Sequence, residues 1–463
     1  MTVRQRHRYI AFGVVALVLI AFGVGIAVMA QRSLSGGSGS KPVGFTPQGL
    51  LACTSASWCV TEGPGGGNGP PPKFWSWNGH SWQPMSESPE YVHDSTAYVN
   101  GLACTSSKQC VAVGYDEVNC TGVCRTIEST LTVEWNGKKW SQSPLARGPG
   151  GASAELDGVS CPNRNSCFAV GATTEGALVE HWNGDAWEVM ANPLSHLAPF
   201  ALKTWGLAEA ALNSVSCSSV SECTAVGRFS ELTPGIRARL VAESVFGAAA
   251  PAVSQALGVA VVERFDGAAW TASLVPYPPV AQQDRYPWPG NGFDEVSCAS
   301  PTACLASGSA AIGFVFDWWD VSRWLSFDWP GAGLYRIQPL VSCPVSTWCM
   351  AVYQPSFASS SDVADASNSR AVVDVDVWTD ARWEATHGYH IDDTIQYGTA
   401  GIYRDGNHEP ELLSCSSPRF CLVAGSVGQN IPCAPSESYV ARWDGIRWTV
   451  AITDRSYAPS GCK

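Results

Sequence analysis

The chain has 463 residues, of which 15% are charged, and its formal net charge is −12. Beyond the N-terminus it contains no run of lysines or arginines, which disfavours binding to nucleic acid through the phosphate backbone. Glycine (45 residues), proline (30) and tryptophan (20) are abundant, as is typical of a turn-rich all-β protein and not of a helical one.

The N-terminus combines positive charge with a long apolar segment. Residues 1–8 form a basic stub, and residues 9–30 are uncharged and numerous enough to cross a bilayer as one helix. The basic stub would stay in the cytoplasm, so we expect the remainder to lie outside it. The length of the segment favours an uncleaved signal anchor in the cell membrane, and cleavage after Ala30 with secretion is the alternative. Residues 31–44 are rich in glycine and serine and predict a flexible linker.

Residues 45–463 repeat one two-part phrase, which consists of two cysteines six apart and then two aromatic residues five apart. The cysteine pairs are Cys53 with Cys59, Cys104 with Cys110, Cys161 with Cys167, Cys217 with Cys223, Cys298 with Cys304, Cys343 with Cys349, and Cys415 with Cys421. The aromatic pairs are Trp77 with Trp82, Trp135 with Trp140, Trp182 with Trp187, Phe265 with Trp270, Trp319 with Trp324, Trp378 with Trp383, and Trp443 with Trp448. A strict repeat of this kind predicts one closed all-β domain, a seven-bladed β-propeller of four-stranded antiparallel blades.

Within one repeat, the cysteines predict the first hairpin of a blade. In the third repeat, residues 156–161 and 167–171 read as two strands joined by turn residues. Five residues between the cysteines allow them to face each other across these strands, as a disulfide requires. Zinc sites are disfavoured, because one pair in each blade would scatter the ligands around a ring. So many disulfides also fit an exported protein.

The aromatic residues predict the second hairpin of the blade. In the third repeat, residues 177–182 form the third expected strand, and Asn183-Gly184 is a hairpin signal. A two-residue turn there would place Trp182 and Trp187 diagonally, whereas a four-residue loop would place them directly opposite each other. In both cases the indoles share one face of the sheet, where we expect them to fill the core between blades.

Four cysteines lie outside the repeats. They are Cys120, Cys124, Cys433 and Cys462. We expect disulfides here as well: Cys120 with Cys124 inside a loop of the second blade, and Cys433 with Cys462 to tie the C-terminal tail to the last blade. The spacing does not fix these pairings.

Five of the aromatic hairpins end in Gly-x-x-Trp. They are Gly79 to Trp82, Gly137 to Trp140, Gly184 to Trp187, Gly267 to Trp270 and Gly445 to Trp448. The unit resembles blades of the kelch and Asp-box type, although the serine and aspartate of the Asp-box are absent. In those families the box lies between the third and fourth strands, away from the active site. The whole phrase also resembles repeats in exported proteins of high-GC Gram-positive bacteria that mostly lack an assigned activity.

The repeats vary in length only between the second and third strands and between blades. Residues 226–265 and 351–378 are examples of such segments. Loops on a rigid scaffold carry function, so we predict that this face of a membrane-anchored module binds a protein, a glycan or a small ligand. Alternatively, the segments only cap the central channel of a structural cell-envelope module.

Some carboxylates in the repeats could carry chemistry. Asp374 and Asp376 alternate with valines before Trp378, and two carboxylates on one strand face could bind a cation or hydrolyse a glycan. However, the position two residues before the first aromatic is also acidic in three other repeats, which favours a structural role. Those residues are Glu180, Glu263 and Asp317.

The densest polar cluster lies between the sixth and seventh repeats and includes His390, Asp392, His408 and Glu409. These residues could serve in acid–base, metal or glycan chemistry, so a carbohydrate-active hydrolase or lyase is the alternative function. No nucleotide-binding or zinc-protease motif is present, and we expect no cofactor, while a structural cation stays open.

Overall fold

The computed structural model divides into two compact units, Met1–Val43 and Gly44–Lys463, and all the residues that it describes belong to the second. The described residues are 47–63, 73–86, 95–118, 126–143, 154–195, 210–229, 259–274, 292–310, 313–319, 324–326, 339–353, 374–379, 382–385, 406–429 and 437–455. The predicted stub (1–8), membrane span (9–30) and linker (31–44) lie outside them. In the described part of the chain, no helix is long and apolar enough to span a membrane.

The described strands form seven four-stranded antiparallel sheets, which we number in chain order. Sheet 1 contains β1 (Gln48–Ser55), β2 (Trp58–Gly63), β3 (Lys73–Trp77) and β4 (Trp82–Pro84). Sheet 2 contains β5 (Ser95–Ser106), β6 (Gln109–Val118), β7 (Thr126–Trp135) and β8 (Trp140–Gln142). Sheet 3 contains β9 (Ala154–Asn163), β10 (Ser166–Thr173), β11 (Gly176–Trp182) and β12 (Trp187–Val189).

The other four sheets repeat this order. Sheet 4 contains β13 (Ala210–Ser219), β14 (Glu222–Phe229), β15 (Val259–Phe265) and β16 (Trp270–Leu274). Sheet 5 contains β17 (Gly292–Ser300), β18 (Ala303–Ala310), β19 (Gly313–Trp319) and β20 (Trp324–Ser326). Sheet 6 contains β21 (Leu340–Val345), β22 (Trp348–Tyr353), β23 (Asp374–Thr379) and β24 (Arg382–Ala385). Sheet 7 contains β25 (Gly406–Ser417), β26 (Phe420–Gln429), β27 (Glu437–Trp443) and β28 (Trp448–Arg455). The prediction of an all-β chain with four-stranded antiparallel sheets is confirmed.

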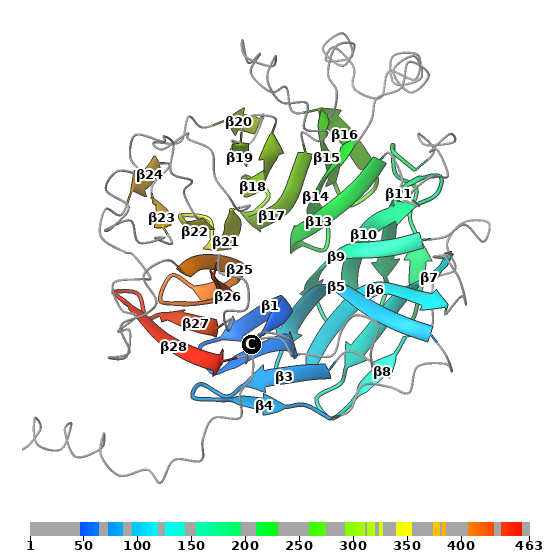
Figure 1. The fold of residues 1–463 in the computed structure, drawn as a ribbon. Coiled ribbons are helices and arrows are strands. Elements are labelled where there is room, and N and C mark those ends of the chain that lie inside the picture. Colours follow the sequence, from blue (N-terminus) through cyan, green and yellow to red (C-terminus); the bar gives the residue numbers. More distant parts are fainter. Residues whose placement is uncertain are drawn as a thin grey trace, which may run out of the picture. The chain divides into compact units, whose positions relative to one another are not determined.

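The first strand of each sheet lies innermost and contacts the first strands of two other sheets. The contacts run from β1 through β5, β9, β13, β17, β21 and β25 and return to β1. Figure 1 shows this arrangement, in which the blue strand β1 lies beside the orange strand β25. A hydrogen bond crosses this last seam, because the N–H of Cys53 donates to Ser414 Oγ at 2.9 Å.

The repeated cysteines form the disulfides that the sequence analysis predicted, one in each sheet, with Cα atoms 4.0–4.1 Å apart. The bonds join Cys53 to Cys59, Cys104 to Cys110, Cys161 to Cys167, Cys217 to Cys223, Cys298 to Cys304, Cys343 to Cys349, and Cys415 to Cys421. Each bond links the first strand of a sheet to the second, so it holds the register of the first hairpin. All seven of these cysteine predictions therefore agree with the structure.

The aromatic pairs also lie where the sequence analysis predicted. The two aromatic residues of each repeat face each other directly, as Trp182 and Trp187 do. The four-residue loop is therefore the correct alternative. In sheet 3 this loop is closed by the carboxamide oxygen of Asn183, which accepts from the N–H groups of Asp185 and Ala186.

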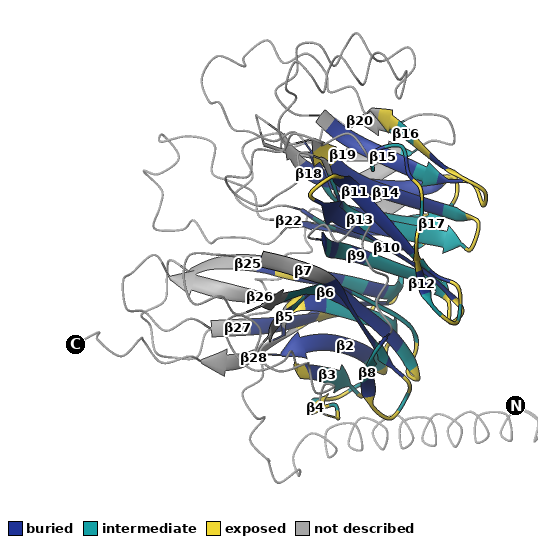
Figure 2. Cartoon of the chain, turned by 90° about the vertical axis from the view of Figure 1, so that its right-hand side faces the viewer, coloured by how far each residue is buried: buried dark blue, intermediate teal, exposed yellow. Residues whose placement is uncertain are grey.

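The core lies between neighbouring sheets. Strand β10 is buried along its whole length. Phe168 of sheet 3 packs with Phe265 and Trp270 of sheet 4. Between sheets 1 and 2, the ring of Trp140 in sheet 2 stacks on that of Phe74 in sheet 1, with ring centroids 4.0 Å apart. Figure 2 shows the buried strands and the exposed hairpin turns at one end. The aromatic pairs whose side chains the structure describes thus pack in the cores between sheets, as predicted.

Serine hydroxyls join the inner strands of consecutive sheets. The serine before the first cysteine of one sheet accepts from the N–H of the first cysteine in the next sheet, at 2.9–3.1 Å. These bonds run from Ser160 to Cys217, Ser216 to Cys298, Ser297 to Cys343, Ser342 to Cys415 and Ser414 to Cys53. Alanine stands at this position in sheets 1 and 2, as Ala52 and Ala103, so the two seams around sheet 2 lack the bond.

Candidate functional site

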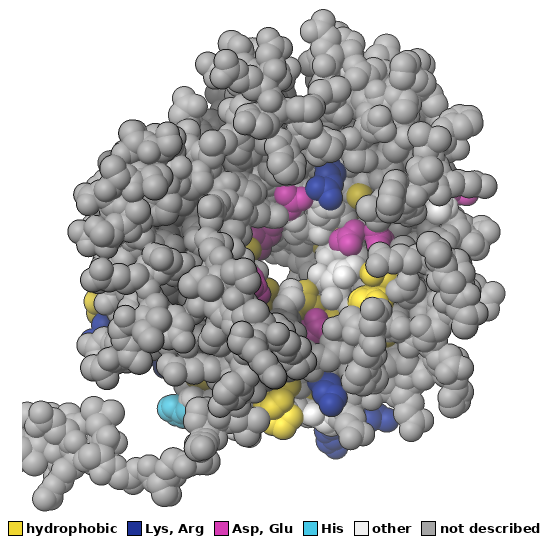
Figure 3. Space-filling model, viewed as in Figure 1, with side chains coloured by type: hydrophobic (Ala, Val, Ile, Leu, Met, Phe, Trp, Pro, Cys, Tyr) yellow, Lys and Arg dark blue, Asp and Glu magenta, His cyan; other side chains and the backbone are white. Residues whose placement is uncertain are grey.

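A cavity of about 500 Å³ opens among the inner strands. Its lining comes from β1, β5, β9, β13, β17, β21 and β25, so every sheet contributes to it. Figure 3 shows Asp and Glu side chains around the central opening of the described part of the chain. We call this feature the channel cavity.

The channel cavity is built on one position of the repeat, the residue four before the first cysteine. We call it the channel position, and its seven residues are Gly49, Asn100, Asp157, Asn213, Asp294, Pro339 and Glu411. All of them except Pro339 line the cavity. The repeat therefore presents four residue types to the cavity from six sheets: glycine, asparagine, aspartate and glutamate.

A β-bulge turns the channel position toward the cavity. The register of the first strand against the second shifts around this position in six sheets, for example between Leu212 and Ser214. A glycine of the second strand stands opposite the bulge in five of these sheets, and Glu62 stands there in sheet 1. A Cβ on Gly227 would lie 1.9 Å from the carbonyl oxygen of Ala211, so only glycine fits there. Bulges commonly redirect side chains at functional sites.

One wall of the cavity is polar and is formed by β5, β9, β13 and β17. The Nδ2 of Asn100 donates to the carbonyl of Leu156 at 3.1 Å and to Asp157 Oδ1 at 3.4 Å. The Nδ2 of Asn213 likewise donates to the carbonyl of Phe293 at 2.7 Å and to Asp294 Oδ1 at 3.3 Å. Each asparagine thus orients the aspartate of the next sheet.

Glu295 adds a further carboxylate to the polar wall. Its Oε2 accepts from the N–H of Val341 at 3.0 Å. In the preceding sheet, Ser214 makes the matching bond and accepts from the N–H of Val296 at 3.3 Å. Glu295 therefore replaces a serine in a seam contact and brings a second ionisable group from sheet 5 to the cavity.

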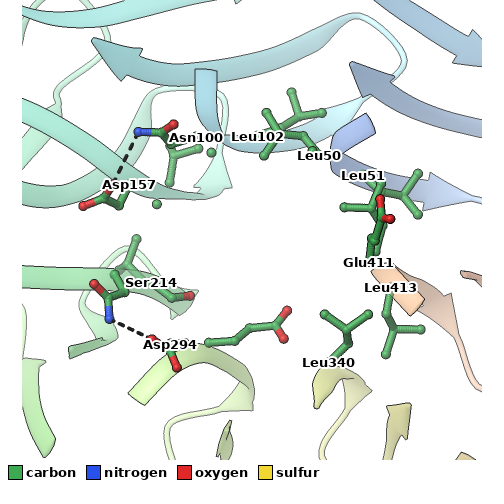
Figure 4. Close-up of a pocket in the computed structure, with 18 of the residues that line it drawn as sticks. Leu50, Leu51, Asn100, Leu102, Asp157, Ser214, Asp294, Leu340, Glu411 and Leu413 are labelled. Carbon is green, nitrogen blue, oxygen red and sulfur yellow. Dashed lines mark hydrogen bonds between the residues drawn. The ribbon is translucent and has the colours of Figure 1, made fainter. Parts of the chain in front are cut away.

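The opposite wall, formed by β21, β25 and β1, is rich in leucine. It contains Leu50, Leu51, Leu340, Leu412 and Leu413. Figure 4 shows labelled leucines of this wall across the cavity from Asp157 and Asp294, with Glu411 on the leucine side. The channel cavity is thus amphipathic, with both amides and three of its four carboxylates on one wall and five of its six leucines on the other.

Two carboxyls of the polar wall, Asp157 and Glu295, take up protons more readily than usual. The pKa of Asp157 is raised to about 7, chiefly by burial and then by Glu155, and Arg228 and the Asn100 bond offset part of the rise. Burial also raises the pKa of Glu295 to about 7, with the Val341 bond lowering it and Asp294 raising it. Near neutral pH both groups are therefore poised between the charged and the neutral form.

One arginine lies near this wall. Arg228 Nη1 is 3.6 Å from Asp294 Oδ1, and its side chain is 43% exposed against 18% for the aspartate. Gly292 lies beneath the arginine stem, because a Cβ on that glycine would lie 2.4 Å from Arg228 Cβ. Arg228 belongs to β14 and is not among the residues that line the cavity.

The structure gives the strand positions of four of the six predicted catalytic candidates. Asp374 and Asp376 lie on β23 of sheet 6, opposite Tyr353 and Ala351. His408 and Glu409 lie on the first strand of sheet 7, opposite Val427 and Ser426. The side chains of these four residues, and His390 and Asp392 altogether, lie outside the described residues. The same holds for Cys120, Cys124, Cys433 and Cys462, so all these predictions stay as they were made.

The recurrent acidic residue before the aromatic pair lies between sheets in the two repeats where its side chain is described. Glu180 is buried, and its Oε1 accepts from Thr130 Oγ1 of sheet 2 at 3.2 Å. Burial raises the pKa of Glu180 to about 7 and that of Glu263 to about 8, an effect that the Leu194 backbone partly offsets for Glu263. These two carboxyls are part of the core, as their recurrence suggested.

The channel position was not predicted from the sequence, although a signal was present. The regular phrase was interpreted as scaffold, and function was expected in the variable segments. Four residues before each first cysteine, however, the repeat changes from Asn and Asp to Gly, Pro and Glu, while the position two residues later is always leucine or valine. Variation at a fixed position inside a strict repeat was the available signal.

Comparison with known proteins identifies no family for the chain. No family model and no curated protein matches the chain. Solved structures with a similar arrangement include hydrazine synthase of Kuenenia stuttgartiensis, at 9% identity over 73% of this chain and 79% of the other, with a TM-score of 0.37. The six-bladed β-propeller lectin of Aleuria aurantia has 11% identity over 81% and 99%, with a TM-score of 0.32. The WD40 domain of fission yeast SCAP has 8% identity over 91% of each chain, with a TM-score of 0.38.

The lectin and the WD40 domain are β-propellers, and this chain is all-β with four-stranded antiparallel sheets. Every one of the three TM-scores lies below 0.5. The function of this chain therefore has to be argued from its own residues.

Proposed function

We propose that this chain is a seven-bladed β-propeller that acts as a binding module, with the channel cavity as its ligand site. The observation that carries the proposal is the cavity itself, whose volume of about 500 Å³ falls within the usual range of small-molecule sites. The seven sheets and the bond from Cys53 to Ser414 between the first and last of them support the blade count. The capped four-residue aromatic loops, with Gly184 at a φ of 102°, support blades of the kelch and Asp-box kind.

We further propose that residues 9–30 anchor the module in the membrane and that the propeller lies outside the cytoplasm. The seven disulfides support this location, because reducing compartments do not sustain such a set. The segments of variable length follow each second strand and precede each first strand. A ligand would then enter the cavity from the end of the module where these segments attach.

A fragment screen tests the binding function. Small-molecule fragments are screened by ligand-observed NMR against the full chain in lipid nanodiscs and against a Glu411→Trp variant. Glu411 is exposed and lines the cavity, so the indole would fill the site with little disturbance of the core. We expect fragments that bind the wild type and lose binding in the variant. Fragments that bind both equally, or none that bind the folded chain, would overturn the channel cavity as the ligand site.

One observation favours the hydrolase alternative. Asp157 and Glu295 both line the cavity, and burial raises the pKa of each to about 7, which suits a general acid at neutral pH. Release of reducing ends from soluble cell-wall glycans by the wild type, and its loss in Asp157→Asn and Glu295→Gln, would favour an enzyme. Turnover that persists in both variants would exclude these carboxyls as the catalytic pair.

A further inference from the structure

We infer that the channel cavity takes a small organic cation with an apolar body, such as an alkyl or arylalkyl ammonium compound. This inference rests on the proposed binding function and specifies its ligand class. It depends on three features of the cavity: an excess of acidic residues on its lining, an opposite wall of alkyl groups, and a size that suits an organic molecule.

The described lining of the cavity carries four acidic residues and no basic one. Asp157, Asp294, Glu295 and Glu411 line the cavity, and none of its described lining residues is a lysine, arginine or histidine. Arg228 reaches Asp294 from outside the lining and is 43% exposed, so solvent screens much of its charge. Carboxylates around one cavity repel each other, and a bound cation would relieve that repulsion.

Hydrogen bonds hold the carboxylates of the polar wall in fixed orientations. Asn100 and Asn213 hold Asp157 and Asp294 through Oδ1 in each case. Glu295 is held through Oε2 by the N–H of Val341. Apart from Arg228 beside Asp294, these donors belong to the backbone and to neutral amides, so they fix the orientation of the carboxylates without adding positive charge. An ammonium group supplies both the opposite charge and the N–H donors.

The leucine wall specifies the rest of the ligand. Leu340 and Leu51 are half-buried, and Leu412 and Leu413 are each 8% exposed. Leu412 and Leu413 already pack into the cores between sheets, so a fully hydrated ion would leave mainly the exposed parts of Leu340 and Leu51 in contact with water. An apolar body attached to the cation would cover them, and its transfer from water contributes to affinity in proportion to the area buried. The cavity volume leaves room for both parts.

A bare metal ion fits this lining less well. The four carboxylates belong to three different inner strands, β9, β17 and β25, around the cavity. Among the described residues, no three histidine, cysteine or acidic side chains come together closely enough to hold a metal ion. An extended organic cation does not need such convergence, because one or two carboxylates suffice to bind its charged end.

Three probes that share one apolar body test the inference. 4-Phenylbutylammonium, 4-phenylbutanol and 4-phenylbutyrate are titrated into the full chain in nanodiscs at pH 8 by isothermal titration calorimetry, with empty nanodiscs as the blank. We expect the ammonium probe to bind about tenfold or more tightly than the alcohol, since a hydrogen bond between charged groups outweighs a neutral one, and the anion not to bind. If the alcohol or the anion binds as well as the cation, the inference fails and the binding function stands.

Two variants localise the effect. Asp157→Asn removes one cavity charge, and we expect it to weaken binding of the ammonium probe about fivefold to tenfold while the alcohol is unaffected. Asp185→Asn removes a charge at an exposed turn outside the cavity and should change neither. Equal binding of the cation to all three proteins, or no binding of any probe to the folded wild type, would overturn the inference. In the second case the fragment screen decides separately whether the cavity binds other ligands.

Discussion

The cysteine–aromatic hairpins and the channel position belong to the same repeat, yet they behave in opposite ways. The hairpins keep one chemistry in all seven sheets, with a disulfide and a facing aromatic pair in each. The channel position keeps one backbone geometry, a bulge in six sheets, and varies its side chain from Gly49 to Glu411. A repeat can therefore fix the direction in which a side chain points while its chemical identity varies from one copy to the next.

If the hairpins are scaffold, the largest loss of stability should come from their aromatics. Trp140 is 2% exposed and stacks on Phe74 of the neighbouring sheet. We expect Trp140→Ala to lower the free energy of unfolding by about 3–5 kcal/mol, as measured by urea denaturation. Ile446 is 76% exposed, and Ile446→Ala should change it by less than about 0.5 kcal/mol. A similar loss of stability in both variants would mean that the aromatic pairs stabilise the fold no more than an exposed side chain does.

The buried carboxyl of Glu263 makes the scaffold sensitive to pH. Its pKa is raised from 4.5 to about 8, so the folded protein keeps a proton that the unfolded chain releases. The stability that this carboxyl contributes is present below pH 4.5 and is lost as the pH rises through 8. We expect Glu263→Gln to raise the free energy of unfolding by about 1–3 kcal/mol at pH 9 and to change it little at pH 4.

Denaturation curves of Glu263→Gln at several pH values would check this, with the exposed Glu188→Gln as the control. Parallel pH profiles for wild type and Glu263→Gln would show that Glu263 ionises normally and has no part in the pH dependence.

The serine bonds between sheets should contribute less each. Ser216 accepts from the N–H of Cys298 at 2.9 Å, so we expect Ser216→Ala to cost about 1 kcal/mol of stability. Ala103 stands at the equivalent place in sheet 2, and Ala103→Ser should add up to about 1 kcal/mol by supplying the missing bond. In thermal denaturation, the Tm of Ser216→Ala should therefore fall and that of Ala103→Ser should rise. A change of the same sign in both variants would contradict the role of the hydroxyl.

The channel position should matter least for stability. Asp294 has a partly exposed ion pair with Arg228. We expect Asp294→Asn to change the free energy of unfolding by no more than about 1 kcal/mol, measured by urea denaturation as for the aromatic variant, and to lower affinity for the ammonium probe. If Asp294→Asn lowered the free energy of unfolding about as much as Trp140→Ala does, the channel carboxylates would also be part of the scaffold.

Much of the fold could be predicted because its signals are local. Cys161 and Cys167 are close in sequence and face each other across one hairpin, and the aromatic pair that follows marks the second hairpin. The turn between Trp182 and Trp187 could not be chosen from its sequence. The Asn183-Gly184 pair suits a two-residue turn, but here the asparagine side chain caps a four-residue loop with Gly184 at a φ of 102°.

The channel cavity could not be predicted, because it depends on contacts between repeats. Asn100 and Asp157 occupy the same position in consecutive repeats, 57 residues apart, and only the bulges turn both toward the same space. A bulge has no sequence signature of its own here, apart from the glycine that faces it in the second strand. The leucine wall was hidden for the same reason, since its residues come from the first sheet and the last two.

The seam between sheets 7 and 1 has a consequence for biosynthesis. Its core joins Trp77 and Trp82 to Leu412, Phe420 and Leu422, so one side of the first sheet is covered by residues made near the end of translation. Until then, a nascent chain would carry an uncovered aromatic surface. The disulfide of the first hairpin needs no distant partner and can form at once. It would hold that hairpin in register until sheet 7 has been synthesised and can pack against sheet 1.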